Sequence, residues 1–147
     1  AASLLACRRG PLDMAGLMLK FPAGDRIVVN GAVIENVGRG ARLRLLTPET
    51  QLLRLRDAID PAAAVTPVGR LAHSVQMMLI GELCPADALP DLVTALAPLR
   101  HAFIDPEDRA CIDALRQHLQ DGQFYQALRH LGRLRRKEAV LLAVART

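Results

Sequence analysis

Residues 26–35 read Arg-Ile-Val-Val-Asn-Gly-Ala-Val-Ile-Glu, two short apolar runs joined by an Asn-Gly dipeptide. Asn-Gly between such runs is the strongest short-range signal of a β-hairpin with a two-residue turn. In the register that this turn imposes, opposite charges face each other across the two strands, which stabilises the pair. The predicted partners are Val29 with Ala32, Ile27 with Ile34, and Arg26 with Glu35.

Further along, residues 41–46 and 51–56 read Ala-Arg-Leu-Arg-Leu-Leu and Gln-Leu-Leu-Arg-Leu-Arg, an alternation with a period of two. Successive side chains of a strand point to opposite faces of its sheet. If these two strands pair through a three- or five-residue loop around residues 47–50, their charged sides coincide. The expected hairpin is sealed by leucines on one face and is cationic on the other. The cationic face would carry Arg42, Arg44, Arg54 and Arg56.

These patterns divide the chain into an N-terminal β part and a C-terminal helical part. Residues 17–56 predict a meander of about five short antiparallel strands, as a sheet or a small open barrel. Residues 57–68, rich in Pro and Ala, predict a connector, and residues 69–145 predict a helical lobe. Residues 1–13 show no clear period and are expected to be a disordered or non-native leader. The predicted fold class is therefore α+β.

Proline, glycine and acidic residues mark the expected helix boundaries. The run Asp105-Pro106-Glu107-Asp108 predicts a helix start, with Asp105 as the cap and acids at the positive end of the helix dipole. Gly122 predicts the end of that helix. Pro90 and Pro98 interrupt residues 86–104, which are therefore expected to form one bent helix or two short ones.

The last predicted helix, from about residue 123 to 145, has an apolar stripe and a cationic ridge. The ridge recurs at three- and four-residue intervals, as one side of a helix requires. Cations near a helix C-terminus are also stabilised by the helix dipole, so a solvated surface is the alternative interpretation. A basic amphipathic helix lying on an anionic membrane is a further one. The ridge consists of Arg129, Arg133, Arg136 and Lys137.

Charge is segregated along this chain of 147 residues, whose formal net charge is +4. Residues 85–121 carry three Lys/Arg against seven Asp/Glu, whereas residues 122–147 carry six against one. Such a distribution suits an anionic partner, although uneven charge also keeps small proteins soluble. No apolar run approaches the roughly 20 residues of a membrane span.

The sequence offers no convincing catalytic or metal-binding constellation. Ser3 and Ser74 lack the Gly-x-Ser-x-Gly setting of a nucleophile elbow. The three cysteines and four histidines lack the spacings of a metal site. We therefore expect a binding module without a cofactor or metal, not an enzyme, and a cytoplasmic location.

Five short segments match one known family: Pro22–Val33, Leu53-Arg54 with Asp57 and Ile59, Val65-Thr66-Pro67, Met77-Met78-Leu79 and Phe124–Leu128. On these segments, residues 17–142 resemble the FlbT family of flagellum-biosynthesis regulators. The segments that carry the resemblance are spread over most of the chain, in the order and spacing of the family. Residues 68–73 depart from it, because the family usually has a basic residue and an aromatic pair there.

The resemblance implies a post-transcriptional repressor of flagellin synthesis that binds the 5′ untranslated region of flagellin mRNA and affects its translation or decay. In some relatives the effect is positive, and a companion family, FlaF, works with or against them. The seven arginines and one lysine of the predicted hairpin and ridge are the expected RNA-binding residues, through phosphate contacts. The alternative is a protein-interaction factor acting on flagellin, its chaperone or FlaF, with the Met77-Met78 pair as adaptable apolar surface. Exposed strand edges also permit homo-oligomers.

Overall fold

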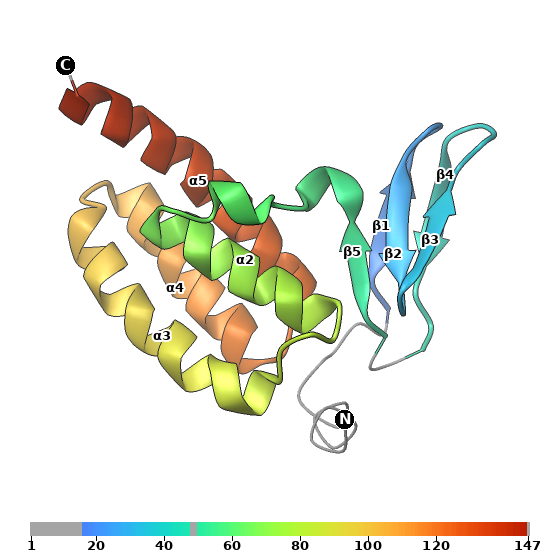
Figure 1. Ribbon diagram of the computed structural model, residues 1–147, viewed down its shortest axis with the longest axis horizontal. Coiled ribbons are helices and arrows are strands. Elements are labelled where there is room, and N and C mark those ends of the chain that lie inside the picture. The colour runs from blue at the N-terminus through green and yellow to red at the C-terminus, as the bar shows by residue number, and fades with distance from the viewer. Residues whose placement is uncertain (1–15, 48–49, 147) are drawn as a thin grey trace.

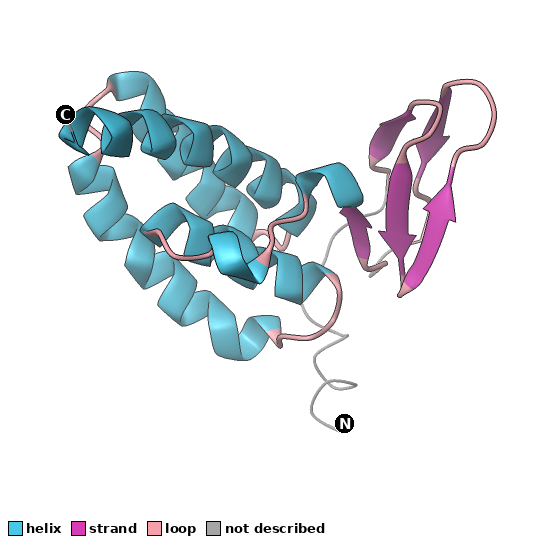
Figure 2. Ribbon diagram, turned by 45° about the horizontal axis from the view of Figure 1, so that its top comes forward, coloured by secondary structure: helices cyan, strands magenta, loops and turns pink. Residues whose placement is uncertain are grey.

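The computed structural model describes residues 16–47 and 50–146, and within them the chain has the predicted α+β architecture (Figure 1). Strands come first, and α-helices follow after two short 3₁₀ turns. The strands gather at one end of the molecule and the helices at the other (Figure 2). In these ranges the strands form two small sheets and no closed barrel. The predicted leader, residues 1–13, lies outside the described residues.

The Asn-Gly hairpin forms as predicted. Strands β2 (Arg26–Val29) and β3 (Ala32–Glu35) pair antiparallel in the expected register. Asn30 and Gly31 have φ angles of 49° and 86°, which are the left-handed values that a two-residue turn of this type requires. The Arg26 Nε and Glu35 Oε1 atoms lie 3.1 Å apart across the strands.

The prediction that residues 41–46 and 51–56 pair as a second hairpin is wrong. Strand β4 (Ala41–Arg44) pairs with β1 (Met18–Phe21) in a two-stranded sheet. Strand β5 (Leu52–Arg54) pairs instead with β2, at the edge of a three-stranded sheet with the order β3-β2-β5. Arg42 and Arg44 are therefore in one sheet and Arg54 in the other, and the common cationic face does not form.

Burial explains this choice of partners. Strand β5 is the strand nearest the helices (Figure 1), and its three residues are all buried, arginine included. Strand β4 is exposed along its whole length. The Asn30 side chain fixes the start of β5, because its Oδ1 atom accepts the backbone N–H of Gln51 at 3.0 Å. The period of two then ends, since residues 55–57 form the 3₁₀ turn η1 (Leu55–Asp57). Leu43 and Leu55, expected in the interior, are exposed.

Four helices complete the described part of the chain, and side chains cap two of them. Thr66 Oγ1 accepts the Gly69 N–H at 3.1 Å, and Asp105 Oδ1 accepts the Glu107 N–H at 3.0 Å, as predicted. Gly122, with φ of 74°, follows the helix that Asp105 begins. The helices are α2 (Pro67–Leu79), α3 (Pro85–Ala102), α4 (Pro106–Gln120) and α5 (Phe124–Arg146).

Helix α3 contains both Pro90 and Pro98 and runs through them as one element. One bent helix and two short helices were the predicted forms, and the structure has one helix in place of two. The Thr94 hydroxyl donates to the Pro90 carbonyl oxygen at 2.8 Å, one turn earlier on the exposed side.

One hydrophobic core connects strands and helices. It includes Leu19 and Phe21 of β1, Leu52 of β5, and the apolar stripe of α5 that begins at Phe124. Because Phe124 and Leu131 are completely buried, α5 forms the centre of the helical part. No helix in the described ranges has the length and hydropathy needed to cross a membrane.

Candidate nucleic-acid interface

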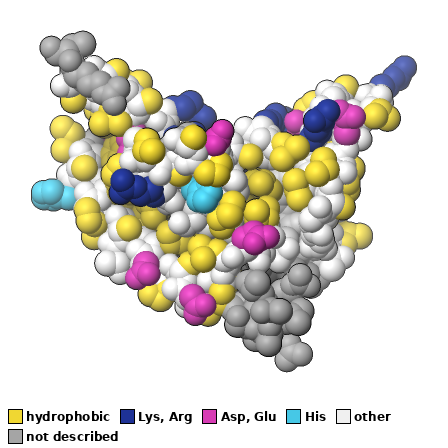
Figure 3. All heavy atoms as spheres, in the orientation of Figure 1, with side chains coloured by type: hydrophobic (Ala, Val, Ile, Leu, Met, Phe, Trp, Pro, Cys, Tyr) yellow, Lys and Arg dark blue, Asp and Glu magenta, His cyan; other side chains and the backbone are white. Residues whose placement is uncertain are grey.

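A cationic cavity of about 560 Å³ lies where β5 and η1 meet helices α2 and α5. We call it the arginine pocket. The face of the molecule drawn in Figure 3 is hollowed between helices and strands, and Lys and Arg side chains lie on both sides of this hollow. The charged residues that line the pocket are Arg54, Arg56, Asp57, Arg129, Arg135 and Arg136.

Helix α5 supplies three of these arginines because of its periodicity. Arg129 and Arg136 are seven residues apart, about two helical turns, so they lie on one side of the helix. Gly132 lies between them and also lines the pocket. Arg56 comes from η1 on the opposite wall, where the 3₁₀ turn redirects a chain that would otherwise continue as a strand.

Arg54 forms the buried end of this wall. Its Nη2 atom lies 2.9 Å from Asp25 Oδ2 and also donates to the Lys20 carbonyl oxygen. Its Nη1 atom is 3.5 Å from the Tyr125 hydroxyl oxygen. Burial works against the charged form, but the hydrogen bonds with Tyr125 and Asp25 outweigh it and raise the pKa of Arg54 above its ordinary value. The prediction that Arg54 faces solvent on a cationic sheet is therefore wrong.

The other pocket arginines lack such partners. Among the described residues, no carboxylate lies within ion-pair distance of Arg56, Arg129 or Arg136. Arg135 is likewise without an ion pair in this part of the chain, and it is half-buried. Asp57 is the one carboxylate among the lining residues. The arginines that line this concave surface therefore carry an excess of positive charge.

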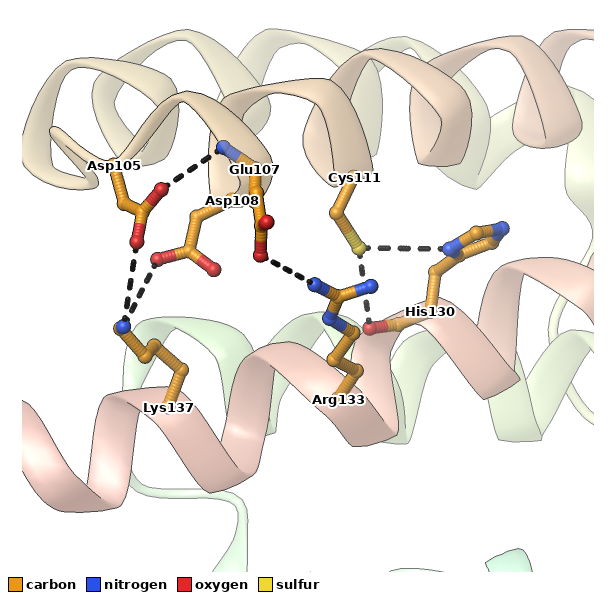
Figure 4. Close-up of polar contacts among 7 residues, drawn as sticks. All are labelled: Asp105, Glu107, Asp108, Cys111, His130, Arg133 and Lys137. Atoms are coloured by element: carbon orange, nitrogen blue, oxygen red, sulfur yellow. Dashed lines mark hydrogen bonds and ion pairs between the residues drawn. The ribbon is translucent and has the colours of Figure 1, made fainter.

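Arg133 and Lys137, predicted in the same ridge, lie on another side of α5 and face α4 (Figure 4). Arg133 Nη2 is 3.6 Å from Glu107 Oε2. Lys137 Nζ is 3.7 Å from Asp105 Oδ2 and 3.6 Å from Asp108 Oδ2. The prediction of a continuous cationic ridge is therefore wrong, because Arg133 and Lys137 face the carboxylates at the start of α4.

A thiol from α4 and an imidazole from α5 meet in the same contact between the two helices (Figure 4). Cys111 Sγ lies 3.5 Å from His130 Nδ1, and the His130 ring stacks on His118 with centroids 5.0 Å apart. Burial raises the pKa of the Cys111 thiol, and burial together with His118 lowers the pKa of His130. Both groups are thereby held neutral, which does not favour a thiolate nucleophile. No group of His, Cys, Asp or Glu side chains in the described ranges is arranged to hold a metal ion.

Arg42 and Arg44 are exposed on β4 and form a smaller cationic patch with a residue that sequence analysis missed. Lys20 of β1 lies opposite Arg42 in the antiparallel pair. Arg44 lies opposite Met18, and its Nε atom is 3.2 Å from the Met18 sulfur. Like charges directly opposite one another destabilise a strand pair, so this patch also favours an anion.

The structure thus separates the eight predicted residues into three groups. Arg54, Arg56, Arg129 and Arg136 line the arginine pocket. Arg42 and Arg44 lie on β4, and Arg133 and Lys137 face α4. Arg135 is the pocket residue that the ridge pattern missed. Its signal was its spacing of three residues from Gly132 and seven from Leu128, which both line the pocket as well.

Fold and site together define a small α+β protein with a concentrated arginine pocket. A family model described as "Flagellar protein FlbT" matches residues 17–142. The chain belongs to this family, as the sequence resemblance implied.

Curated relatives match over most of the chain and carry closely similar descriptions. The "Probable flagellum biosynthesis repressor protein FlbT" of Rhodopseudomonas palustris is 30% identical over 133 residues, which cover 86% of this chain and 98% of the relative. The protein of that description from Chelativorans sp. is 31% identical over 128 residues, 87% of each chain. The "Flagellum biosynthesis repressor protein FlbT" of Caulobacter vibrioides is 27% identical over 112 residues, 76% of this chain and 79% of the relative. No solved structure matches the chain.

Proposed function

We propose that this protein is a cytoplasmic repressor of flagellin synthesis that binds the 5′ untranslated region of flagellin mRNA and affects its translation or decay. The names of its relatives support a role in repressing flagellum biosynthesis. The observation that carries the RNA-binding step is the arginine pocket, with its four arginines that lack ion-pair partners among the described residues.

Guanidinium groups suit this task because they are always charged and present several donors in one plane. They bind phosphate oxygens in bidentate fashion, which an ammonium group does not. The four pocket arginines without ion pairs come from two elements, η1 and α5, so a backbone that enters the hollow would be contacted from both sides. Arg42, Arg44 and Lys20 on the outer strands add a second, shallower place for phosphates.

Phosphate contacts release counterions, so the affinity depends on salt. For a single strand, four contacts give a slope of about −3 for log K against log salt concentration. The affinity should then fall about 50-fold between 50 and 200 mM salt. A matching slope for a scrambled RNA would assign specificity to RNA shape or to a second protein.

The experiment is a salt titration of the protein against flagellin leader RNA and a scrambled control, measured by filter retention. The variant Arg129→Gln/Arg136→Gln removes two pocket charges on the exposed side of α5 and should make the slope shallower by about 1.4. Arg133→Gln/Lys137→Gln removes two charges that already face carboxylates of α4, and it is the matched control. Arg42→Gln/Arg44→Gln tests the second place for phosphates on β4. Unchanged retention in the pocket variant with loss in the β4 variant would move the site to the outer strands.

A second candidate function is a protein-interaction factor that acts on flagellin, its chaperone or FlaF and affects mRNA indirectly. The observation in its favour is the end of α5, where Val140, Leu141 and Leu142 are 59%, 45% and 39% exposed. The methionine pair contributes less surface than expected, because Met78 is buried in the core. Exposed Val33 and Ile34 on β3, one of the two edge strands of its sheet, offer a second copy of the chain a place to pair.

A pull-down from nuclease-treated lysate separates the two functions. Capture of flagellin or FlaF that survives nuclease treatment, and that the variant Leu141→Ser/Leu142→Ser loses, would establish the protein-interaction factor. Loss of all capture on nuclease treatment supports the RNA-binding repressor.

A further inference from the structure

We propose that the arginine pocket receives a 5′-polyphosphate group, either the triphosphate end of an RNA or a free nucleoside triphosphate. The assignment rests on the proposed function in one respect, since it gives the RNA-binding site a particular part of the RNA. It goes beyond that function by distinguishing a chain terminus from the phosphodiester backbone.

The charge of the pocket favours a cluster of phosphates over a single phosphodiester. Arg54 is neutralised by Asp25, and Asp57 offsets one of the remaining four arginines. An internal phosphodiester brings one negative charge, and the next is separated from it by a ribose. A terminal phosphoryl group alone carries about −1.5 to −2 charges near neutral pH, and two more phosphates follow it directly in a triphosphate. Within this volume, only a triphosphate carries enough negative charge to balance the excess positive charge of the arginines.

The size and shape of the pocket agree with a terminal group. Sites for small molecules and cofactors occupy about 300–1,000 Å³, and the volume of the arginine pocket, about 560 Å³, falls within that range. Its walls are a 3₁₀ turn and helices, so its arginines converge on a concavity instead of following a flat surface.

Gly132 is a separate observation in favour of an occupant. Glycine inside a helix destabilises it relative to alanine, so it needs a packing or functional reason. A Cβ atom at Gly132 would meet no heavy atom within 4 Å, so packing does not demand a glycine there. Gly132 also lacks the positive φ that makes glycine necessary at turns. What it does provide is room in the wall between Arg129 and Arg136.

Arg54 adds an unused donor to the same wall. Its Nε atom is buried and has no hydrogen-bond partner, although the other two guanidinium nitrogens are satisfied. Buried polar groups are nearly always hydrogen-bonded, so an unsatisfied one calls for an explanation. The atom is closed to solvent in the structure, so an anionic oxygen would supply the missing acceptor only together with a shift of the Arg54 side chain.

The test compares one leader RNA with a 5′-triphosphate, a 5′-monophosphate or a 5′-hydroxyl end, each labelled at its 3′ end. Fluorescence anisotropy at constant ionic strength measures the three affinities, with ATP and inorganic triphosphate as competitors. We expect the triphosphate form to bind about tenfold or more tightly than the hydroxyl form, because several charge-assisted hydrogen bonds are added.

A steric variant separates the pocket from charge alone. Gly132→Leu keeps every arginine but places a side chain in the space between Arg129 and Arg136. The ratio of the affinities for triphosphate and hydroxyl ends should then fall to about one. The matched control is Ala143→Leu, which adds similar bulk to an exposed position of α5 outside the pocket and should keep the preference. Circular dichroism melts confirm that both variants fold.

The outcomes distinguish this inference from the proposed function. Equal affinity for all three RNA ends, without competition by ATP or inorganic triphosphate, overturns the inference and leaves leader binding intact. Binding of ATP without retention of any leader RNA supports the polyphosphate site and refutes the proposed function. Binding of neither triphosphates nor RNA overturns both.

Discussion

Arg54 is held in the contact between β5, β1 and α5 by three oxygen atoms. They belong to the Asp25 carboxylate, the Lys20 carbonyl and the Tyr125 hydroxyl. The side chains of Arg54 and Asp25 are only 6% and 14% exposed. A buried pair of this kind contributes little net stability compared with apolar residues, yet each charge depends strongly on the other.

Substitution of Arg54 by Met should therefore leave the Asp25 carboxylate buried without its partner. We expect the free energy of unfolding to fall by about 3–5 kcal/mol, measured by urea denaturation. The control is Arg26→Met, which breaks the exposed Arg26–Glu35 pair and should cost less than about 1 kcal/mol. Equal losses in the two variants would show that the buried Asp25–Arg54 pair matters no more for stability than the exposed Arg26–Glu35 pair.

His130 makes stability depend on pH. Its pKa is lowered in the folded protein by burial first and then by His118, Arg133 and Arg129. As the pH falls below about 6.5, the unfolded chain binds a proton at this histidine before the folded protein does. The free energy of unfolding should therefore decrease from pH 7 to pH 5 through this group.

The measurement is urea denaturation across that pH range. His130→Gln should decrease the slope of unfolding free energy against pH, while the exposed His101→Gln should leave it unchanged. An unchanged slope in His130→Gln would mean that this histidine binds its proton equally well in both states.

At the scale of elements, helix α5 holds two separate groups of cationic side chains. One side places Arg133 and Lys137 beside the acidic first turn of α4. The other side opens Arg129 and Arg136 to the pocket. A single basic segment therefore has two roles, one in packing and one in the candidate interface.

The two glycines Gly31 and Gly132 should respond oppositely to alanine. Gly31 has φ of 86° in the β2–β3 turn, so Gly31→Ala should lower the free energy of unfolding by about 1–2 kcal/mol. Gly132 lies in a regular helix with open space around it, so Gly132→Ala should raise it by about 0.5–1 kcal/mol. Thermal denaturation measures both. A loss of stability in Gly132→Ala would mean that this glycine has a structural role.

At the scale of the whole molecule, the pocket concentrates charge that the described residues do not balance. Relief of this repulsion should stabilise the protein at low salt. Arg129→Gln/Arg136→Gln should raise the free energy of unfolding by about 0.5 kcal/mol at low ionic strength. The gain should shrink at about 0.5 M salt because the charges are then screened within a few ångströms.

The control for this prediction lies on the same helix. Arg133→Gln/Lys137→Gln removes charges that face Glu107, Asp105 and Asp108, and should not stabilise the protein at any salt concentration. Calorimetry at low and high salt measures both variants. Equal effects of the two variants would show that the pocket is not under electrostatic strain.

Prediction from the sequence succeeded where causes are local and failed where they are distant. Asn30 and Gly31 fix their hairpin through their own backbone conformations, and Asp105 caps α4 through an N–H two residues away. The partners of β4 and β5 could not be read in this way. An alternating pattern states which side chains share a face of a strand, but not which strand lies beside it.

The sequence by itself determined that strands precede helices, the register of the Asn-Gly hairpin, and the family to which the chain belongs. Only the tertiary structure decided that β5 joins β2, that Arg54 is buried, and that arginines from η1 and α5 meet in one pocket. The physical reason is that burial of Leu52 and Leu53 between β2 and the helices outweighs the local Arg–Leu alternation. Contacts between distant segments follow from the apolar surface that they bury together, which no short stretch of sequence records.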